Sequence, residues 1–306
     1  MAVIRLRSLG DCVLCTPAIA LLRQARPDLD IAVVVEERFA DVFDKTLRPS
    51  VMALRAFAPD LCLNLHGGTR SARLTLLSGA RFRAGFDIFK PAIYNVSIPT
   101  AQQILGVTRR VHTAEHMACA MFFLGVPVTE VPRACMPAAL GRASFVPKMP
   151  VPKMPAPKMP APKMPAPKIP YSVIHPMAAT AEKTWPAAGF LEVAGYLRRE
   201  SGLEPVFIAG PGEDLSPFRS FRCVAGAPLA EMAGLLRDAA LFIGNDSGPA
   251  HVAAAFGTPQ VVFFGPSDEE IWHPWRTAHR ILKADPIQSI TPAQVIEAID
   301  ALQGRA

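Results

Sequence analysis

The sequence has no run of about 18 uncharged apolar residues, the length that spans a bilayer as a helix. Its N-terminus, MAVIRLRSLGD, also lacks the apolar core of a secretory signal peptide. Cysteine is scarce: six residues in 306 are too few for the disulfide framework of a secreted scaffold. We therefore expect a cytoplasmic protein, and we expect any contact with a membrane to be peripheral.

Acidic residues are missing from the middle of the chain, where residues 146–170 read VPKMP VPKMP APKMP APKMP APKIP. Ten prolines in these 25 residues leave too few amide donors for a helix or sheet, and polyproline II is the state they favour. We interpret the repeat as a linker. The alternative is a docking segment for a proline-reading module or an anionic surface, because lysine recurs every fifth residue.

Charge is distributed unevenly around this linker. The whole chain carries 32 basic and 26 acidic residues, for a net charge of +6. Residues 1–145 alone carry +6, the repeat +5, and residues 171–306 carry −5. Since 306 residues suit two domains, we predict an N-terminal domain over 1–145 and a C-terminal domain over 171–306, with different partners, one of them anionic.

Both halves alternate short apolar runs with helical patterns, which predicts parallel sheets of the α/β class. In the first half we expect strands at 2–6, 31–35 and 61–65, and helices at 13–26, 70–78 and 112–124; residues 43–58 are poorly patterned, so an element there is missing or irregular. In the second half we expect strands at 171–174, 205–209, 241–243 and 260–264, and helices at 187–200, 229–237, 250–256 and 292–302. The architecture predicted is two Rossmann-like domains facing across a cleft, with ligands bound by the loops that follow the strands.

The loop GNDSGPAH at residues 244–251 is the richest of these loops. Its glycines allow close backbone approach, and the helix that follows offers free amides to a phosphate. Asp246, Ser247, Gly248 and His251 are therefore candidates for an anion site. The alternative is that Asp246 or Ser247 only caps the helix.

Two other loops carry candidate ligand-binding side chains. Glu213 follows the strand at 205–209 and could accept hydrogen bonds from ribose hydroxyls, or it could be an acidic residue of a first helical turn. The Gly-Pro-Gly before it is not a full dinucleotide fingerprint, which counts against a nicotinamide enzyme. His66, Arg70 and Arg73 follow the strand at 61–65 and could meet phosphorylated sugars, or they could form a solvated helix face.

Several other motifs have plainer interpretations. Cys12 and Cys15 have no second pair that would complete a zinc site, so we interpret both as small core residues. The acidic pair at 28 and 30 indicates a turn. His112 and His116 share a helical face without a third ligand, and we take them as ordinary helix residues. The sequence predicts no metal site.

The segment GNDSGPAHVAAAFGTPQVVFFGPSD resembles the signature of glycosyltransferase family 9, the heptosyltransferases of the lipopolysaccharide inner core. Three other segments are similar to the same family: IRLRSLGDCVLCTPAI, HPMAATAEKTWP and LNLHGGTRSARLTLLSGARFRAGF. The resemblance covers both halves of the chain and excludes only the repeat.

This resemblance implies a GT-B fold, with the acceptor bound by the N-terminal domain and the nucleotide-sugar donor by the C-terminal domain. It implies inverting, metal-independent transfer of a heptosyl group from ADP-heptose to an anionic, lipid-linked core saccharide, at the cytoplasmic face of the inner membrane, with no cofactor and no nucleic acid. Asp11 matches the family's general base and Lys183 the cation at the leaving phosphate. Thr180 is the one hydroxyl residue where some members have a pair.

Two alternatives to this implied function stay open from the sequence. One is a GT-B enzyme, either a transferase or an epimerase, that uses another nucleotide sugar. The other is a scaffold that presents the proline-rich repeat.

Overall fold

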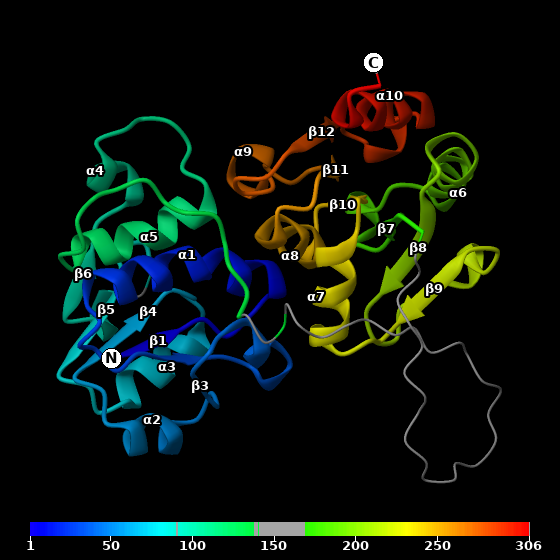
Figure 1. Cartoon of the computed structure of the whole chain (residues 1–306). Coiled ribbons are helices and arrows are strands. Elements are labelled where there is room, and N and C mark those ends of the chain that lie inside the picture. The colour runs from blue at the N-terminus through cyan, green and yellow to red at the C-terminus, as the bar shows by residue number, and fades with distance from the viewer. Residues whose placement is uncertain (90, 138–139, 141–168, 306) are drawn as a thin grey trace, which may run out of the picture.

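The computed structural model describes residues 1–89, 91–137, 140 and 169–305, and it forms two α/β domains side by side (Figure 1). Each domain is built on a sheet of six parallel strands. The strand orders are β3-β2-β1-β4-β5-β6 and β12-β11-β10-β7-β8-β9, so both sheets have the Rossmann arrangement. The predicted fold class is therefore confirmed, while most of the repeat at 146–170 lies outside the described residues.

The N-terminal sheet is covered on both faces. One face packs on the long helix α1 and on α5, through Val3, Leu63 and Ala84. The other face packs on α2 and α3, through Ile4 and Cys62. The elements of this domain are β1 (Ala2–Ile4), α1 (Leu9–Ala25), β2 (Ala32–Val34), η1 (Glu37–Val42), β3 (Thr46–Leu47), α2 (Val51–Phe57), β4 (Leu61–Asn64), α3 (Thr69–Leu77), β5 (Phe82–Phe86), η2 (Pro91–Ile93), β6 (Val96–Ile98), α4 (Ala101–Leu105) and α5 (Thr113–Phe123).

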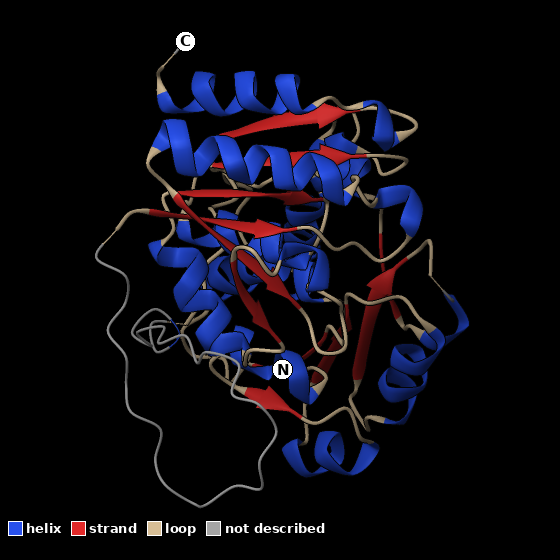
Figure 2. Cartoon of the chain, turned by 90° about the vertical axis from the view of Figure 1, so that its right-hand side faces the viewer, coloured by secondary structure: helices blue, strands red, loops and turns tan. Residues whose placement is uncertain are grey.

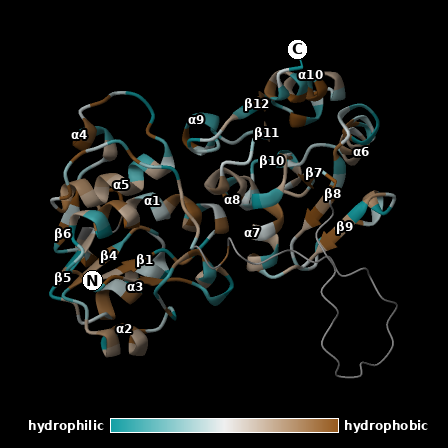
Figure 3. Cartoon of the chain, viewed as in Figure 1, coloured by the Kyte–Doolittle hydropathy of each residue, from teal (hydrophilic) through white to brown (hydrophobic). Residues whose placement is uncertain are grey.

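The C-terminal sheet repeats this plan, with helices on both faces (Figure 2). Gly202 and Gly257 adopt left-handed backbone angles after η5 and α8, where glycine commonly ends a helix. Strand β8 has hydrophobic colours and α9 hydrophilic ones in Figure 3, in keeping with a buried sheet. The elements are β7 (Tyr171–His175), η4 (Ala181–Lys183), α6 (Ala187–Tyr196), η5 (Leu197–Ser201), β8 (Glu204–Ala209), η6 (Ser216–Phe218), β9 (Arg222–Ala225), α7 (Leu229–Asp238), β10 (Leu241–Asn245), α8 (Gly248–Phe256), β11 (Gln260–Phe264), α9 (Glu269–Trp272), β12 (His279–Lys283), η7 (Ile287–Ser289) and α10 (Pro292–Gln303).

The strands that the sequence did not reveal are β3, β5, β6, β9 and β12. They lie toward the edges of the two sheets, where one side or one end of a strand is exposed and the continuous apolar run of a buried strand is absent. In residues 43–58, where an element was expected to be missing or irregular, no element is missing. They hold the two-residue strand β3 and the helix α2, both too short to produce a clear pattern.

The two domains meet along α1 and α8, and the apolar cluster on the α1 side of the first sheet continues into α7 and α8 of the second domain. Glycines allow the close approach. A Cβ on Gly10 would overlap Cδ2 of His251, and a Cβ on Gly248 would lie 3.0 Å from Cβ of Leu9. Because neither position tolerates a larger side chain without displacement, the starts of the two helices lie against each other at the cleft.

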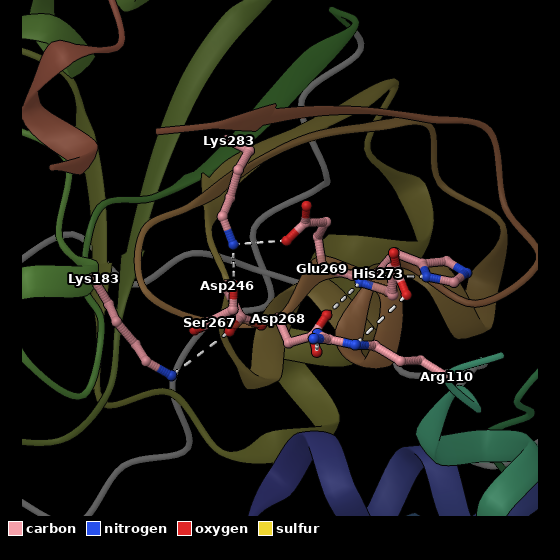
Figure 4. A network of polar contacts seen from close by, with 9 residues as sticks. Arg110, Lys183, Asp246, Ser267, Asp268, Glu269, His273 and Lys283 are labelled. Atoms are coloured by element: carbon pink, nitrogen blue, oxygen red, sulfur yellow. Dashed lines mark hydrogen bonds and ion pairs between the residues drawn. The ribbon is translucent and has the colours of Figure 1, made fainter. Parts of the chain in front are cut away.

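A second contact between the domains involves His112, which is buried and is more than the ordinary helix residue that the sequence suggested. Its Nδ1 accepts a hydrogen bond from the amide of Ala114 and so caps α5. Its Nε2 lies 2.9 Å from the carbonyl oxygen of His273, and its ring stacks on Trp275 with 4.5 Å between centroids. Nearby, Arg110 forms an ion pair with Asp268 of the other domain (Figure 4).

The burial of His112 predicts that acid destabilises the protein. Burial lowers the pKa of His112 to about 3 from 6.5, so between these values the unfolded chain binds a proton that the folded protein does not. The stability present at neutral pH is therefore lost as the pH falls below 6.5. We expect His112 to account for about 2 kcal/mol of the decrease in unfolding free energy between pH 7.5 and pH 5.

Chemical denaturation of the wild type and of His112→Gln at both pH values tests this prediction. The variant should be less stable at pH 7.5 and should lose less stability on acidification. Equal losses in the two proteins would show that His112 is not the titrating group.

Candidate active site

A cavity of about 1100 Å³ lies where the two sheets present the carboxyl ends of their strands. Its N-terminal wall comes from the β1–α1 loop and η1, and its C-terminal wall from the loops after β7, β8, β9 and β10. In each sheet the central strands flank the point where the strand order reverses, which is where such sheets bind ligands. Polar and charged residues lining it are Ser8, Asp11, Glu37, Arg38, Asp41, His175, Lys183, Glu213, Asp246, Ser247 and His251.

Asp11 lies in the first turn of α1, at the cavity wall. Ser8 holds the N-cap position, and Asp11 is the N3 residue, whose carboxylate takes part in a capping box with Ser8. The backbone and hydroxyl of Ser8 donate to Oδ2 of Asp11 at 3.1 and 2.8 Å, and the buried Arg5 forms an ion pair with Oδ1. A carboxylate has about four lone-pair positions, so these three contacts orient Asp11 and leave one position for a further donor.

The N-terminus of α8 faces Asp11 from the second domain. Ser247 is the N-cap residue, and its side chain makes no capping hydrogen bond, so the alternative of a plain helix cap is wrong for Ser247. The first helical turn begins at Gly248. Pro249 has no N–H and the amide of Ala250 donates to the carbonyl of Ser247 at 3.2 Å, so the amides of Ser247 and Gly248 are the ones that remain for a ligand in the described part of the chain. These amides, with the positive end of the helix dipole, make this edge of the cavity suitable for an anion.

Lys183 supplies a cation at the same edge. Its Nζ lies 3.8 Å from Oδ2 of Asp246, and the close-up shows the lysine reaching toward Asp246 (Figure 4). The loop that carries Lys183 is anchored by the buried Asn245, whose Oδ1 accepts from the amide of Trp185 at 3.0 Å and whose Nδ2 donates to the carbonyl of Pro176 at 2.9 Å. Asn245 thus ties the loop after β7 to the end of β10 and sets the position of the lysine.

His175 is a cavity residue that sequence reasoning missed. It ends β7 and is buried, with Nδ1 3.0 Å from Oγ of Ser247 and Nε2 3.9 Å from Oε2 of Glu213. Burial lowers the pKa of His175 to about 4, so the imidazole is neutral at neutral pH. Glu213 is held by the amide of Gly210, which donates to Oε2 at 2.5 Å. The available signal was position, because His175 directly follows an apolar run at the centre of the sheet.

His251 lies one turn into α8, with its ring against Gly10 of the other domain. It is buried, and burial lowers the pKa of this imidazole, while the carboxylates of Asp246 and Asp11 act in the opposite direction. Its Nδ1 has no hydrogen-bond partner among the described residues. The neutral ring therefore lies near two carboxylates, one from each domain, where the two domains meet.

Four of the predicted site residues do not line this cavity: Thr180, His66, Arg70 and Arg73. Thr180 and Arg73 have exposed side chains. Arg70 pairs with Glu36 at 3.1 Å, and Arg38, a cavity residue that the sequence did not single out, binds the same carboxylate at 2.9 Å. His66 is half-buried beside Arg5, and burial together with that guanidinium lowers its pKa. Arg70 and His66 are thus connected to the cavity only through neighbours.

The far end of the cavity is apolar. Its lining changes from charged residues to Ile208, Val224, Leu229 and Met232, which come from β8, β9 and α7. A ligand made of an anion and a flat apolar group would therefore bind with its anion near α8 and its apolar group against these side chains.

The family model that describes glycosyltransferase family 9 (heptosyltransferase) matches residues 50–294. The chain belongs to glycosyltransferase family 9. The match includes most of both domains, and it confirms the family that the sequence motifs suggested. As a family 9 member, the chain is a glycosyltransferase by descent.

Curated relatives of this family 9 chain include lipopolysaccharide heptosyltransferase 3 of Escherichia coli, which is 36% identical over 121 residues. That match covers 34% of this chain and 34% of the relative, so it spans about a third of the relative's length. Heptosyltransferase 3 of strain K12 is 35% identical over 116 residues, covering 34% and 33%.

Solved structures resemble this family 9 chain over nearly its full length. E. coli heptosyltransferase WaaC with ADP has a TM-score of 0.77 at 18% identity, covering 98% of this chain and 99% of that one. E. coli ADP-heptose lps heptosyltransferase II has a TM-score of 0.75 at 18% identity, covering 100% and 99%. A family 9 glycosyl transferase of Veillonella parvula DSM 2008 has 0.74 at 22%, covering 100% and 97%. At these identities the likeness establishes the fold.

The remaining motifs of this family 9 chain have structural roles. Cys12 and Cys15 are core residues of α1, as predicted, and burial raises the pKa of Cys15 to about 12, so its thiol is unreactive. Within the described residues, no three His, Cys, Asp or Glu side chains gather where they could hold a metal ion. No helix in that part of the chain is both long and apolar enough to cross a bilayer.

Proposed function

We propose that this chain transfers a heptosyl group from ADP-heptose to a sugar hydroxyl of a lipopolysaccharide inner core, with inversion at the anomeric carbon and without a metal ion. The relatives named as lipopolysaccharide heptosyltransferases and the similar fold of a heptosyltransferase with ADP support this substrate class. One observation of this structure carries the proposal: a carboxylate with a free lone-pair position, Asp11, faces a helix N-terminus and a lysine across one cavity.

Asp11 acts as the general base in this proposal. The attacking hydroxyl must lose its proton as its oxygen bonds to the anomeric carbon, and a carboxylate at the cleft can accept that proton. Arg5 and Ser8 hold the carboxylate in one orientation, which keeps its remaining lone pair toward the cavity. Attack from the Asp11 side and departure toward α8 place the nucleophile and the leaving group on opposite faces of the sugar, which inverts the configuration.

The C-terminal domain binds the donor. Departure of ADP leaves negative charge on its terminal phosphate, and Lys183, the amides at Ser247 and Gly248, and the dipole of α8 offset that charge without a divalent cation. Asp246 orients Lys183, and His251 forms the wall beside the phosphates. Glu213 accepts hydrogen bonds from the ribose, and the adenine occupies the apolar end near Met232. Thr180 has no part in this set, because its exposed side chain does not line the cavity.

The N-terminal domain binds the anionic, lipid-linked acceptor. Arg38 and Arg70 share the carboxylate of Glu36 at the rim, and forked guanidinium groups suit acceptor phosphates. His66 lies near Arg5, and burial together with the charge of Arg5 keeps the imidazole neutral by lowering its pKa, while Arg73 is exposed on the neighbouring helix. In this proposal the enzyme works at the cytoplasmic face of the inner membrane, where such an acceptor grows.

A transfer assay with a panel of nucleotide sugars and heptose-deficient lipopolysaccharide tests the proposal. ADP-heptose should give product, and UDP- and GDP-sugars should give none. Product from another donor, or epimerisation of the donor without an acceptor, would favour an enzyme of different specificity. Thermal shift with ADP, UDP and GDP separates nucleotide binding from transfer, since a ligand at 100 times its dissociation constant stabilises by about 2.7 kcal/mol.

Two conservative variants of His175 test how the donor site is organised. If Nδ1–H donates to Ser247, the serine hydroxyl is free to donate to a phosphate. Asn retains a donor near the Nδ1 position, whereas Gln retains one near Nε2. We expect His175→Asn to bind ADP within about threefold of the wild type and His175→Gln to bind about tenfold more weakly, the loss of one charge-assisted hydrogen bond. Calorimetric titration measures the ADP affinity of both variants. Tighter binding by His175→Gln than by His175→Asn would show that the important contact of His175 is the one between Nε2 and Glu213.

A further inference from the structure

The most exposed large apolar side chain of the described residues is Met52, at 84%, and it lies on α2. Leu76 of the neighbouring helix α3 is 50% exposed. Neither side chain belongs to the cavity or to the contact between the domains. Two exposed apolar side chains on neighbouring helices suit a surface that contacts a partner or a membrane.

Arginines accompany these apolar residues. Arg55 lies three residues after Met52 and Arg73 three residues before Leu76, so each pair shares a helix face. We name these four residues, Met52, Arg55, Arg73 and Leu76, the α2–α3 face. Neither α2 nor α3 contains an acidic residue, and from residue 48 to residue 83 the chain carries six arginines and one acid, Asp60.

The two helices form a continuous surface on one side of the first domain. Leu54 of α2 and Leu74 of α3 pack in the same apolar cluster, against the sheet face opposite α1 and α5. Nε of Arg55 donates to the carbonyl of Leu77 at 3.0 Å, which joins α2 to the end of α3. Figure 1 shows both helices on the outer side of the N-terminal sheet, on the face turned away from the long helix α1. The opposite sides of both helices, with the α2–α3 face, are therefore exposed.

We propose that the α2–α3 face docks on an anionic lipid bilayer, with Met52 and Leu76 entering the interface and the arginines meeting lipid phosphates. Charge complementarity selects this occupant. A second copy of the chain in a two-fold dimer would place arginines against arginines, whereas an anionic bilayer attracts them. The proposal adds a membrane-facing surface to the proposed function, yet it requires neither the donor nor the acceptor to be correctly assigned.

Co-sedimentation of the full chain with vesicles tests the docking, because the vesicles contain no saccharide acceptor. The wild type should bind vesicles of phosphatidylcholine with 30% phosphatidylglycerol and should not bind pure phosphatidylcholine. Arg55→Gln should weaken binding about fivefold, the effect of one basic residue near an anionic surface. The triple variant Met52→Ser/Arg55→Gln/Leu76→Ser should weaken it by more than tenfold.

Matched substitutions elsewhere provide the control. Val128 is 65% exposed on another part of the N-terminal domain, and Arg219 is exposed in the C-terminal domain. The variant Val128→Ser/Arg219→Gln therefore replaces one exposed apolar residue and one exposed arginine outside the α2–α3 face. This control should bind like the wild type. The double variant Met52→Ser/Leu76→Ser, which retains the hydrogen bond from Arg55 to the carbonyl of Leu77, should fold with an unchanged melting temperature and still bind less.

Three results would overturn the docking proposal: no binding by the wild type, equal losses in the triple variant and its control, or loss only when residues 146–165 are deleted. A change in oligomeric state of the triple variant, seen by sedimentation velocity with vesicle binding intact, would assign the face to self-association. Transfer to a water-soluble acceptor should persist in the triple variant, which separates failed docking from failed catalysis.

Discussion

Replacing Asp11 with asparagine should lower the turnover number by about 10³-fold, within the range attributed to a general base. The amide has nearly the shape of the carboxylate but cannot take the proton from the acceptor hydroxyl. Because Asp11 belongs to the N-terminal wall, the donor site on α8 stays intact, and the dissociation constant for ADP should change by less than about threefold. Turnover with saturating substrates and calorimetry with ADP measure the two quantities.

Two controls accompany this substitution. Ser8→Ala removes one of the two Ser8 donors to Asp11 and retains the base, so its loss of turnover should be far smaller. Asp44→Asn changes an exposed carboxylate that pairs with Arg23 outside the cavity, and it should leave turnover unchanged. Wild-type turnover in Asp11→Asn would remove Asp11 from the proposed mechanism.

Replacing Lys183 with alanine should lower kcat/KM by about 10²- to 10³-fold, the cost of one preorganised group at a developing charge. Two effects act together. The cation at the leaving phosphate is lost, and Asp246, whose side chain is only 12% exposed, is left without its partner beside the pyrophosphate. The affinity for ADP should therefore fall as well, in contrast to Asp11→Asn, and calorimetric titration would show it.

A double variant separates these two effects. Lys183→Ala/Asp246→Asn removes the unpaired negative charge, so it should bind ADP more tightly than Lys183→Ala alone. If ADP binds Lys183→Ala as well as the wild type, the pyrophosphate does not lie at this end of α8, and the donor assignment is wrong.

The strands at the centre of each sheet could be predicted, and those at the edges could not. The strands β1, β4, β7 and β10 are buried on both sides and so consist mostly of apolar residues. In β9 and β12 most residues are only partly buried, so no periodicity distinguishes them from loops. The same reasoning explains why α2 was not predicted, since only one of its seven residues is buried.

The candidate site divides in a similar way. Asp11, Lys183 and the 246–251 loop were found because each follows a central strand and matches a family motif, and Glu213 because it follows the strand at 205–209. The structure places all of them around one cavity. Their roles stay predictions. His175 opens the family-like segment HPMAATAEKTWP but was not singled out, because it reads as the end of an apolar strand. Arg38 was missed because an arginine in an irregular turn has no motif of its own.

The order of residues along the chain determined the family, the α/β class and the loops that carry the chemistry, because apolar periodicity and glycine-rich turns are local properties. The tertiary structure decided which loops come together, because this depends on packing between the two domains, whose contacting residues are far apart in the sequence. Gly10 accepts the ring of His251, Gly248 accepts Leu9, and His112 reaches His273 across the cleft. Such contacts depend on shape complementarity between whole helices, and no local pattern in either segment specifies the other.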